Sequence, residues 1–254
     1  MYTIVYFSPT GNVLHLATKL ANRLGIHKDK ILPLEFTEPE QLTNNSHLIL
    51  LYPIHAFNAP RTVKRFVRYL PSGLYNDVSI IGVGCTTNWV DKAASADLRK
   101  LLSEKGYPII LDELLAMPLT FIMEFPDEVA RKLIAESEEK IDDICIALID
   151  GRKTIIKPEF KSQLLHFIGK VEQLASRLFG LELHADKNCN SCGICWSNCP
   201  ENNIKCNSNG KPKFGFSCLM CMRCIYNCPQ KAITPRFSKF IPIKNGYSIT
   251  HYLK

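Results

Sequence analysis

The sequence predicts two folding units in one chain, a doubly wound α/β unit with a parallel sheet and a small α+β unit rich in cysteine. In the first 150 residues, short apolar runs alternate with amphipathic stretches, which is the order of parallel strands joined by helices. Nine of the eleven cysteines lie between 189 and 228. We therefore expect an α/β unit at 1–150, a linker and amphipathic helix at 151–183, a cysteine-rich unit at 184–236 and a C-terminal tail at 237–254.

Short apolar runs and helical periodicity define the elements of the α/β unit. Gly25 suits a helix C-terminus, and Pro60 and Pro126 suit helix starts. The predicted order is β-α-β-β-α-β-α-β-α, which places helices on both faces of the sheet. Buried strands are predicted at 2–7, 30–34, 47–52, 78–84 and 107–111, and helices at 12–24, 60–70, 90–105 and 127–149.

Composition and apolar run length indicate a soluble globular chain. Of the 254 residues, 46% are hydrophobic and 22% are charged, which provides a buried core and argues against disorder. The N-terminus has no basic region followed by a cleavage site, so we expect no signal peptide. The longest apolar stretch, 48–57, contains Pro53 and His55 and is too short for a transmembrane segment. We expect a cytoplasmic protein.

The cysteine-rich unit is an internal repeat with the spacing C-x2-C-x2-C-x3-C-P. One copy ends at Pro200 and the other at Pro229. In two-cluster iron–sulfur proteins with this run, the fourth cysteine of each copy ligates the cluster held by the other copy. We therefore predict two [4Fe–4S] clusters. Their ligands are Cys189, Cys192, Cys195 and Cys228 for the first cluster, and Cys218, Cys221, Cys224 and Cys199 for the second.

Zinc is the main alternative for these cysteines. Zinc sites use C-x2-C as separated pairs and not as a run of four, so the spacing favours iron–sulfur clusters. Cys206 fits neither copy, and we interpret it as a spare thiol. Cys145 lies on the apolar face of a predicted helix, where we expect it to be a core residue.

The first predicted strand runs into the loop Ser8-Pro9-Thr10-Gly11-Asn12 and then into a helix. Small hydroxyl residues and helix N-terminal N–H groups at such a junction suit a phosphate. The loop lacks the lysine of a nucleoside-triphosphate site and the G-x-G-x-x-G of a dinucleotide site. Simple capping of the helix is the alternative function of these residues.

This loop, together with the five-strand α/β pattern, resembles the FMN-binding loop of flavodoxins. With the cysteine repeat behind it, nearly the full chain is similar to flavodoxin–ferredoxin fusion proteins of anaerobic bacteria and archaea, and the stretch 188–234 carries much of the similarity. The resemblance implies a flavodoxin-like sheet of order 2-1-3-4-5 and a 2[4Fe–4S] ferredoxin-like domain. It also implies that Ser8, Thr10, Gly11 and Asn12 hold the FMN phosphate. Val13 stands where such loops commonly have threonine, which removes one hydroxyl contact.

Two further loops are expected to hold the flavin ring, one after the third strand and one after the fourth. Phe57 and Trp89 are candidates to stack on the ring, although core packing suits them equally. His55 could bond the flavin, with an ordinary structural histidine as the alternative. The Met117-Pro118-Leu119-Thr120 segment would form another wall. The predicted ring contacts are Pro53, Ile54, His55, Ala56 and Phe57 in one loop, and Cys85, Thr86, Thr87, Asn88 and Trp89 in the other.

The stretch 160–183 is strongly amphipathic. Its apolar residues, from Phe160 to Phe179, fall on one helical stripe. We interpret this stretch as a docking helix whose apolar stripe packs the two units together. A helix that lies on a membrane surface or on a partner is the alternative.

Charge is divided unequally along the chain. Residues 1–150 contain 15 basic and 19 acidic residues, and residues 151–254 contain 16 basic and 5 acidic residues. Thiolate-ligated clusters and a flavin phosphate would offset most of the positive surplus, so nucleic acid is an unlikely partner. We predict an electron-transfer protein that links FMN and two clusters to redox partners such as ferredoxin-like carriers. An FMN-dependent reductase of a small molecule is the alternative.

Overall fold

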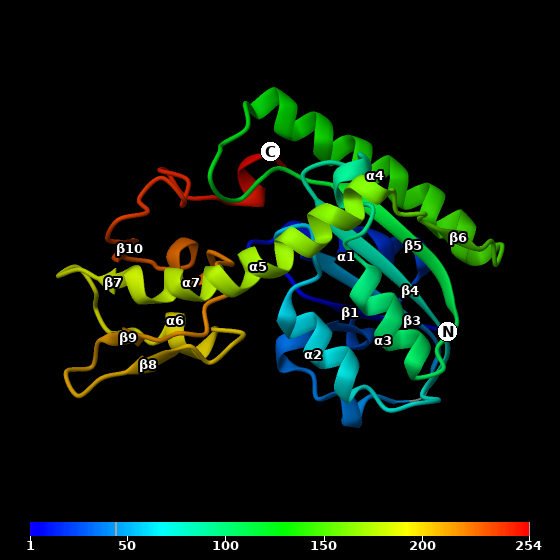
Figure 1. The fold of residues 1–254 in the computed structure, drawn as a ribbon, viewed down its shortest axis with the longest axis horizontal. Coiled ribbons are helices and arrows are strands. Elements are labelled where there is room, and N and C mark those ends of the chain that lie inside the picture. Colours follow the sequence, from blue (N-terminus) through cyan, green and yellow to red (C-terminus); the bar gives the residue numbers. More distant parts are fainter. Residues whose placement is uncertain (44, 254) are drawn as a thin grey trace.

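The computed structural model describes residues 1–43 and 45–253 and contains a six-stranded parallel sheet of order β2-β1-β3-β4-β5-β6 (Figure 1). The order 2-1-3-4-5 matches the prediction, and it is the strand order of the flavodoxin-like fold. Lys254, the last residue of the predicted tail, lies outside the described residues. The strands are β1 Tyr2–Tyr6, β2 Ile31–Pro33, β3 Asn45–Pro53, β4 Tyr75–Gly84, β5 Ile109–Ala116 and β6 Thr154–Ile155.

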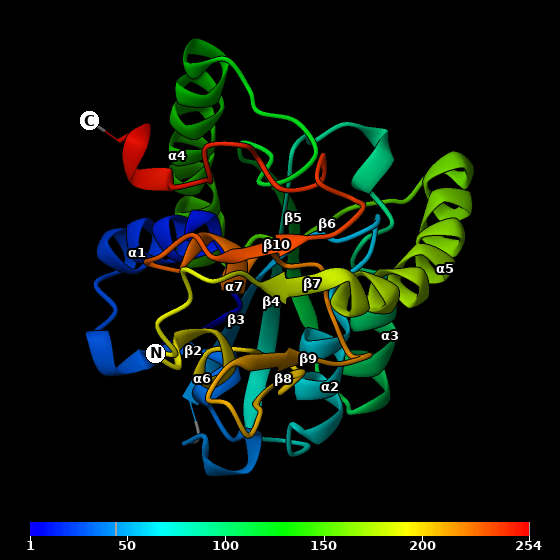
Figure 2. The same ribbon diagram turned by 90° about the vertical axis from the view of Figure 1, so that its left-hand side faces the viewer.

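Helices cover both faces of this sheet, as Figure 1 and Figure 2 show. The helices α1 (Asn12–Leu24) and α4 (Asp127–Ile149) share one apolar core with the sheet, and their bounds are those predicted. The helices α2 (Arg61–Tyr69) and α3 (Ala96–Glu104) share the core on the other face. Because both faces are covered, the central strands are almost continuously apolar.

Two predictions for this unit were wrong in detail. The predicted linker contains β6, which pairs with β5 through Thr154 opposite Leu111 and Ile155 opposite Asp112. Two residues are too few to give a periodic signal, and the pairing depends on the exposed edge of β5. The predicted helix 90–105 is broken into a 3-10 turn, Trp89–Asp91, and α3. The Ser95 hydroxyl donates to buried Asp112 Oδ2 at 2.6 Å, which holds this break against the sheet.

The cysteine-rich unit consists of short elements related by the sequence repeat. Left-handed residues recur at matching positions of the two copies: Ser191 and Met220, Gly193 and Met222, and Asn202 and Lys231. The sequence repeat is therefore also a repeat of backbone conformation. The unit's elements are β7 Leu183–Ala185, α6 Ile194–Ser197, β8 Ile204–Cys206, β9 Pro212–Phe214, α7 Arg223–Tyr226 and β10 Ile233–Pro235, with β7 pairing with β10 and β8 with β9.

Buried ion pairs join the two units. Arg61 Nε and Arg65 Nη1 of α2 lie 3.1 and 3.0 Å from Glu201 Oε2, and only 7% of the Glu201 side chain is exposed. Arg223 of α7 donates to the Ser8 carbonyl at 2.9 Å and pairs with buried Glu35. A charge removed from water in this way needs its partner, so these contacts fix how the cysteine-rich unit sits on the carboxyl ends of β1 and β3.

Helix α5 (Phe160–Glu182) contacts both units mostly through residues outside its apolar stripe, although Phe179 at the end of the stripe is buried. Gln173 Nε2 donates to the His55 carbonyl at 2.9 Å, and Asn58 Nδ2 donates to the His166 carbonyl at 2.8 Å. Gly180 lies against Gly215 of the cysteine-rich unit. The predicted contact face was wrong, because most of the stripe is exposed. Within the described residues, the helices all fall short of the length and apolarity that a bilayer crossing requires.

Candidate cofactor sites

The fold brings the second predicted quartet together around a small cavity of about 30 Å³. Phe179, Leu183 and Phe214 supply its apolar wall. Backbone amides point at two of the sulfurs. Asn203 N lies 3.4 Å from Cys199 Sγ, and Met220 N lies 3.3 Å from Cys218 Sγ. Such amide donors suit a sulfur that carries negative charge. The four cysteines at this cavity are Cys199, Cys218, Cys221 and Cys224.

The first predicted quartet lines a second cavity, of about 20 Å³, beneath Trp196 and Ile233. The amide of Ala232 lies 3.4 Å from Cys228 Sγ, and it is the repeat counterpart of the Asn203 amide. Each cavity therefore takes three cysteines from one copy of the repeat and the fourth from the other. The cysteines at this second cavity are Cys189, Cys192, Cys195 and Cys228.

The electrostatics of these cavities require a positively charged occupant if the thiols are to ionise. Burial raises the pKa of Cys218 to about 12 and the pKa values of Cys195 and Cys221 to about 11. Iron can offset this desolvation cost because thiolate is its natural ligand here. In the described part of the chain, no three His, Cys, Asp or Glu side chains are grouped closely enough for one metal ion. The donor set at each cavity is four thiols, and a [4Fe–4S] cluster would take one thiolate per iron.

Two of the three cysteines outside the quartets, Cys145 and Cys206, lie away from both cavities. Cys206 is exposed at the end of β8, and Cys145 is buried in the core between α4 and the sheet. Cys145 is therefore a core residue, as predicted from its place on the helix. Neither residue lines a cysteine cavity.

The predicted phosphate loop forms one end of a third cavity, at the carboxyl ends of β1, β3 and β4. Gly11 precedes α1 with a left-handed φ of 102° and has no side chain to cap the first amides of the helix. Ser8 Oγ accepts a hydrogen bond from the Leu14 amide at 2.9 Å. Ser8, Thr10, Asn12 and Val13 all line the cavity. A helix N-terminus with hydroxyl groups beside it fits a phosphate.

The predicted ring contacts are divided between this cavity and its surroundings. Pro53, Ile54, His55 and Cys85 line it, and so does the segment from Met117 to Phe121. Ala56 lines a neighbouring cavity of about 30 Å³ together with His55 and Met220. The structure does not bring the remaining residues to either cavity: Phe57, Thr86, Thr87, Asn88 and Trp89.

The cavity at the phosphate loop is small. Its volume is about 60 Å³, which holds a few water molecules and not a three-ring flavin. The loop chemistry fits the phosphate end of FMN, whereas the ring end fits only if the surrounding loops separate. The segment Met117–Phe121 of this wall lies outside the strands and helices, and its Pro118 and Thr120 carbonyls accept hydrogen bonds from Asn12 and Tyr226.

Burial controls the titratable groups beside this cavity. Burial lowers the pKa of His55 to about 4, so its imidazole is neutral at pH 7. Burial also raises the pKa of Asp91 to about 6, and Asp91 Oδ2 lies directly against Gly84 at the end of β4. The pKa of the Cys85 thiol is raised by the same cause. The cavity therefore favours neutral forms on the side away from the phosphate loop.

The C-terminal segment also contributes to the phosphate loop, which sequence reasoning missed. Tyr247 donates from its hydroxyl to Asn12 Oδ1 at 2.5 Å, while Asn12 Nδ2 donates to the Pro118 carbonyl at 3.0 Å. Ile249 lies so close to Gly11 that an added Cβ there would be 2.9 Å from it. Tyr247, Ile249 and Tyr252 have no regular spacing in the sequence that would indicate which surface they cover.

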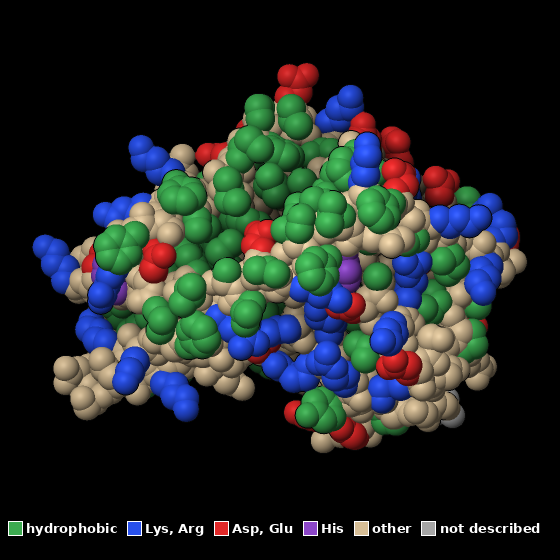
Figure 3. Space-filling view, viewed as in Figure 1, with side chains coloured by type: hydrophobic (Ala, Val, Ile, Leu, Met, Phe, Trp, Pro, Cys, Tyr) green, Lys and Arg blue, Asp and Glu red, His purple; other side chains and the backbone are tan. Residues whose placement is uncertain are grey.

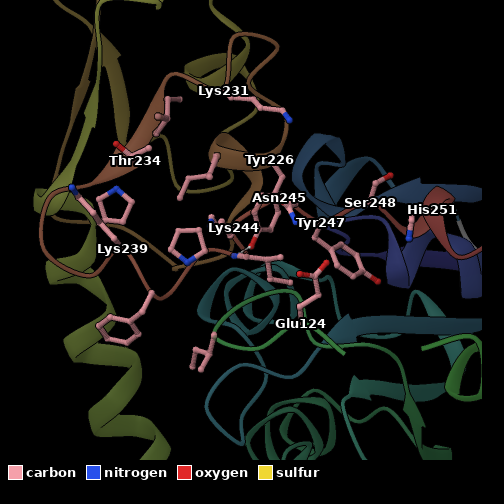
Figure 4. Close-up of a pocket in the computed structure, with 18 of the residues that line it drawn as sticks. Glu124, Tyr226, Lys231, Thr234, Lys239, Lys244, Asn245, Tyr247, Ser248 and His251 are labelled. Carbon is pink, nitrogen blue, oxygen red and sulfur yellow. Dashed lines mark hydrogen bonds between the residues drawn. The ribbon is translucent and has the colours of Figure 1, made fainter. Parts of the chain in front are cut away.

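A larger groove of about 1090 Å³ lies between the cysteine-rich unit and this C-terminal segment (Figure 4). Ile225 lines both the groove and the Cys218 cavity, and Ile233 lines both the groove and the Cys228 cavity. Lys231, Lys239 and Lys244 stand around the groove. One apolar side chain therefore separates the groove from each cysteine cavity.

Comparison with known proteins finds similarity only among solved structures. No protein-family model matches the chain, and no curated protein matches it. A flavodoxin from the domain Archaea is 15% identical over 56% of this chain and 99% of its own, with a TM-score of 0.35. Flavodoxin 2 from Bacillus cereus is 18% identical over 59% and 97%, with a TM-score of 0.41. Rubredoxin oxygen:oxidoreductase from Desulfovibrio gigas is 15% identical over 59% of this chain but 36% of its own, with a TM-score of 0.40.

Proposed function

We propose that this protein transfers single electrons between two [4Fe–4S] clusters and FMN, and links them to redox protein partners. The observation that carries the proposal is a row of three adjoining cavities. His55 and Phe121 line both the phosphate-loop cavity and its neighbour. Leu219 and Met220 line both that neighbour and the Cys218 cavity. Flavin and cluster would thus be separated by little more than one loop.

The chain's own residues have distinct roles in this arrangement. The two quartets would hold the clusters, and the crossed fourth cysteines, Cys199 and Cys228, would keep the clusters close together. Ser8, Thr10 and the start of α1 would hold the phosphate, and neutral His55 would offer a hydrogen bond without charge. FMN supplies a group that accepts one or two electrons, which matches a two-electron partner to one-electron clusters.

Arg223 would couple the sites structurally. It follows Cys221 in the second copy of the repeat and donates to the carbonyl of Ser8 in the phosphate loop at 2.9 Å. Its guanidinium also stacks over Phe7, 5.5 Å from the ring centre. One side chain thus ties the Cys218 quartet to the loop that would hold the FMN phosphate. An Arg223→Leu variant should keep iron and lose flavin affinity.

Anaerobic purification followed by an absorption spectrum and counts of iron, sulfide and flavin tests this function. We expect about eight irons per chain and about one FMN. Stepwise reduction should bleach both the cluster and the flavin absorption. Iron without flavin would remove the flavin part of the proposal, and the absence of both would overturn it.

A second candidate function is reduction of a small molecule, and the large groove favours it. The groove is apolar at its base, has lysines around it and lies one side chain from each cysteine cavity. Such a site suits an anionic oxidant with an apolar body. Small-molecule oxidants that reoxidise the reduced protein, with a KM raised in Lys244→Gln, would support this function. Reoxidation only by protein carriers would support electron transfer.

A further inference from the structure

Seven of the eight exposed large apolar side chains of α5 follow a heptad repeat, and the eighth, Ile168, flanks it. Along the helix their spacing alternates between four and three residues over three heptads. This alternation keeps all seven on one narrow seam and is the pattern of a coiled coil, in which the a and d positions face a partner helix. Figure 3 shows hydrophobic side chains gathered along the band that α5 occupies in Figure 1. The seam residues are Phe160, Leu164, Phe167, Val171, Leu174, Leu178 and Leu181.

The opposite side of α5 packs against the rest of its own chain. Ser162 and Gly169 are buried there, seven residues apart. At Gly169 the helix approaches so closely that an added Cβ would lie 1.8 Å from the Ala56 carbonyl oxygen. The helix therefore cannot rotate to bury its seam in the same molecule. The seam stays directed outward as long as the small residues stay in contact.

The seam is large enough for a stable interface. Phe160 is 82% exposed, Phe167 is 68% exposed and the remaining seam residues are more than half exposed. These fractions amount to an exposed surface on the order of 1,000 Å², compared with about 800 Å² that each partner buries in a typical protein–protein interface. An apolar patch of this size is unusual on a monomer.

The flanking residues suit a second copy of the same helix in parallel register. In a parallel pair each g position faces the next e position of the partner. Arg177 then faces Glu182 of the partner subunit on both sides of the seam, and no like charges meet. Arg177 Nε is buried without a hydrogen-bond partner among the described residues, and two hydrogen bonds from Ser238 hold the Glu182 carboxylate in place. An antiparallel pair centred on Lys170 would bring two lysines together.

We propose that the protein forms a symmetric dimer through a parallel coiled coil of its two α5 helices. The seam, its area and the flanking charges are properties of this chain and do not depend on its redox function. A lipid surface is the other possible occupant of an amphipathic helix, but it requires no heptad regularity and is usually bordered by basic residues on both sides. Here one flank contains Lys161, Ile168, Ala175 and Glu182.

Sedimentation velocity of the anaerobically purified holoprotein over a hundredfold concentration range tests the dimer. The wild-type chain of 28.8 kDa should sediment at twice its mass. Leu174→Asp and Phe160→Glu should each sediment as monomers with unchanged iron content and circular dichroism. Ile149→Asp is the matched control, because Ile149 is 68% exposed on α4 and lies off the seam, and it should remain a dimer.

A charge variant tests the register. Arg177→Glu places carboxylates together in the parallel pair and should weaken the dimer at least tenfold, with recovery at high salt. A monomeric wild type at every concentration would overturn the proposal, and so would a dimer that survives Leu174→Asp and Phe160→Glu. Cosedimentation of a monomeric wild type with phosphatidylserine vesicles, lost in Leu174→Asp, would assign the seam to a lipid surface instead.

Discussion

The α/β unit and the cysteine-rich unit are held together by different means. The α/β unit has two large apolar cores, one on each face of its sheet. The core of the cysteine-rich unit has only four buried apolar residues, Phe179, Leu183, Met222 and Ile233, and two of these lie at its junction with α5. Cysteines from both quartets surround this small core.

Because of this difference, we expect the stability of the two units to depend on their proposed cofactors to different degrees. A sheet covered by helices gains enough from apolar burial to fold without a ligand. A unit with so small an apolar core and several left-handed residues needs a metal group or a neighbouring surface for its stability. The proposed clusters should thus stabilise the fold of the cysteine-rich unit as well as carry electrons. The α/β unit, in contrast, should fold with water in place of FMN.

Removal of iron should reveal the largest difference between the two units. Anaerobic treatment with a chelator and oxidant should unfold the region 184–236, because its small core cannot offset the entropy of its chain. Amide hydrogen exchange followed by mass spectrometry should show loss of protection there and retained protection in β1, β3 and β4. Uniform loss of protection along the chain would contradict the contrast between the units.

Substitution of one cysteine should remove one of the two proposed clusters and leave the other in place. Cys199→Ser should remove the cluster beside Met220 and lower the iron content from about eight to about four per chain, because serine is a poor ligand for this cluster. Cys206→Ser serves as the control and should keep all the iron, since Cys206 lies outside both cavities. Iron counts per chain distinguish the two variants, and equal counts would show that Cys199 is not a cluster ligand.

The pH dependence of the α/β unit should report on His55. Its pKa of about 4 in the folded protein lies below the ordinary value of 6.5, so the unfolded chain binds more protons between these limits. Stability from this group is complete above pH 6.5 and is lost as the pH falls toward 4, by up to about 3 kcal/mol. Denaturant titrations at several pH values should show that the free energy of unfolding falls more steeply below pH 6.5 in wild type than in His55→Gln. Equal pH dependence in the two proteins would mean that other groups dominate.

Substitution of Gly11 should have the smallest of these effects on stability. Gly11→Ala forces alanine to a φ of 102° and pushes its Cβ against Ile249. The combined strain should cost about 1–3 kcal/mol in the free energy of unfolding. Gly73→Ala is a control with a similar φ of 74° and no neighbour within 4 Å, so it measures the backbone strain alone. Urea titration compares them, and equal losses would mean that Ile249 adapts freely.

Much of the fold was predictable because its signals are local. The bounds of α1 and α4 follow from helical periodicity between a glycine and a proline. The alternation of strands and helices predicted a parallel sheet, the resemblance to flavodoxins implied the order 2-1-3-4-5, and the two-residue β6 escaped notice. For the candidate site, the loop from Ser8 to Asn12 was predictable from its residue types, whereas Tyr247 and Arg223 were not, because they approach the loop from more than 200 residues away.

The sequence by itself determined the candidate chemistry of this protein: two quartets of cysteines at the spacing of cluster ligands and, at a strand–helix junction, a loop whose residue types suit a phosphate. These depend on residue identity and short separations along the chain, which any fold of that segment preserves. Only the tertiary structure decided which face of α5 packs inward. Periodicity indicated an apolar face, but the close approach at Gly169 and Gly180 placed the opposite face in contact. Shape complementarity between distant segments outweighed local amphipathicity, and it left the heptad seam exposed.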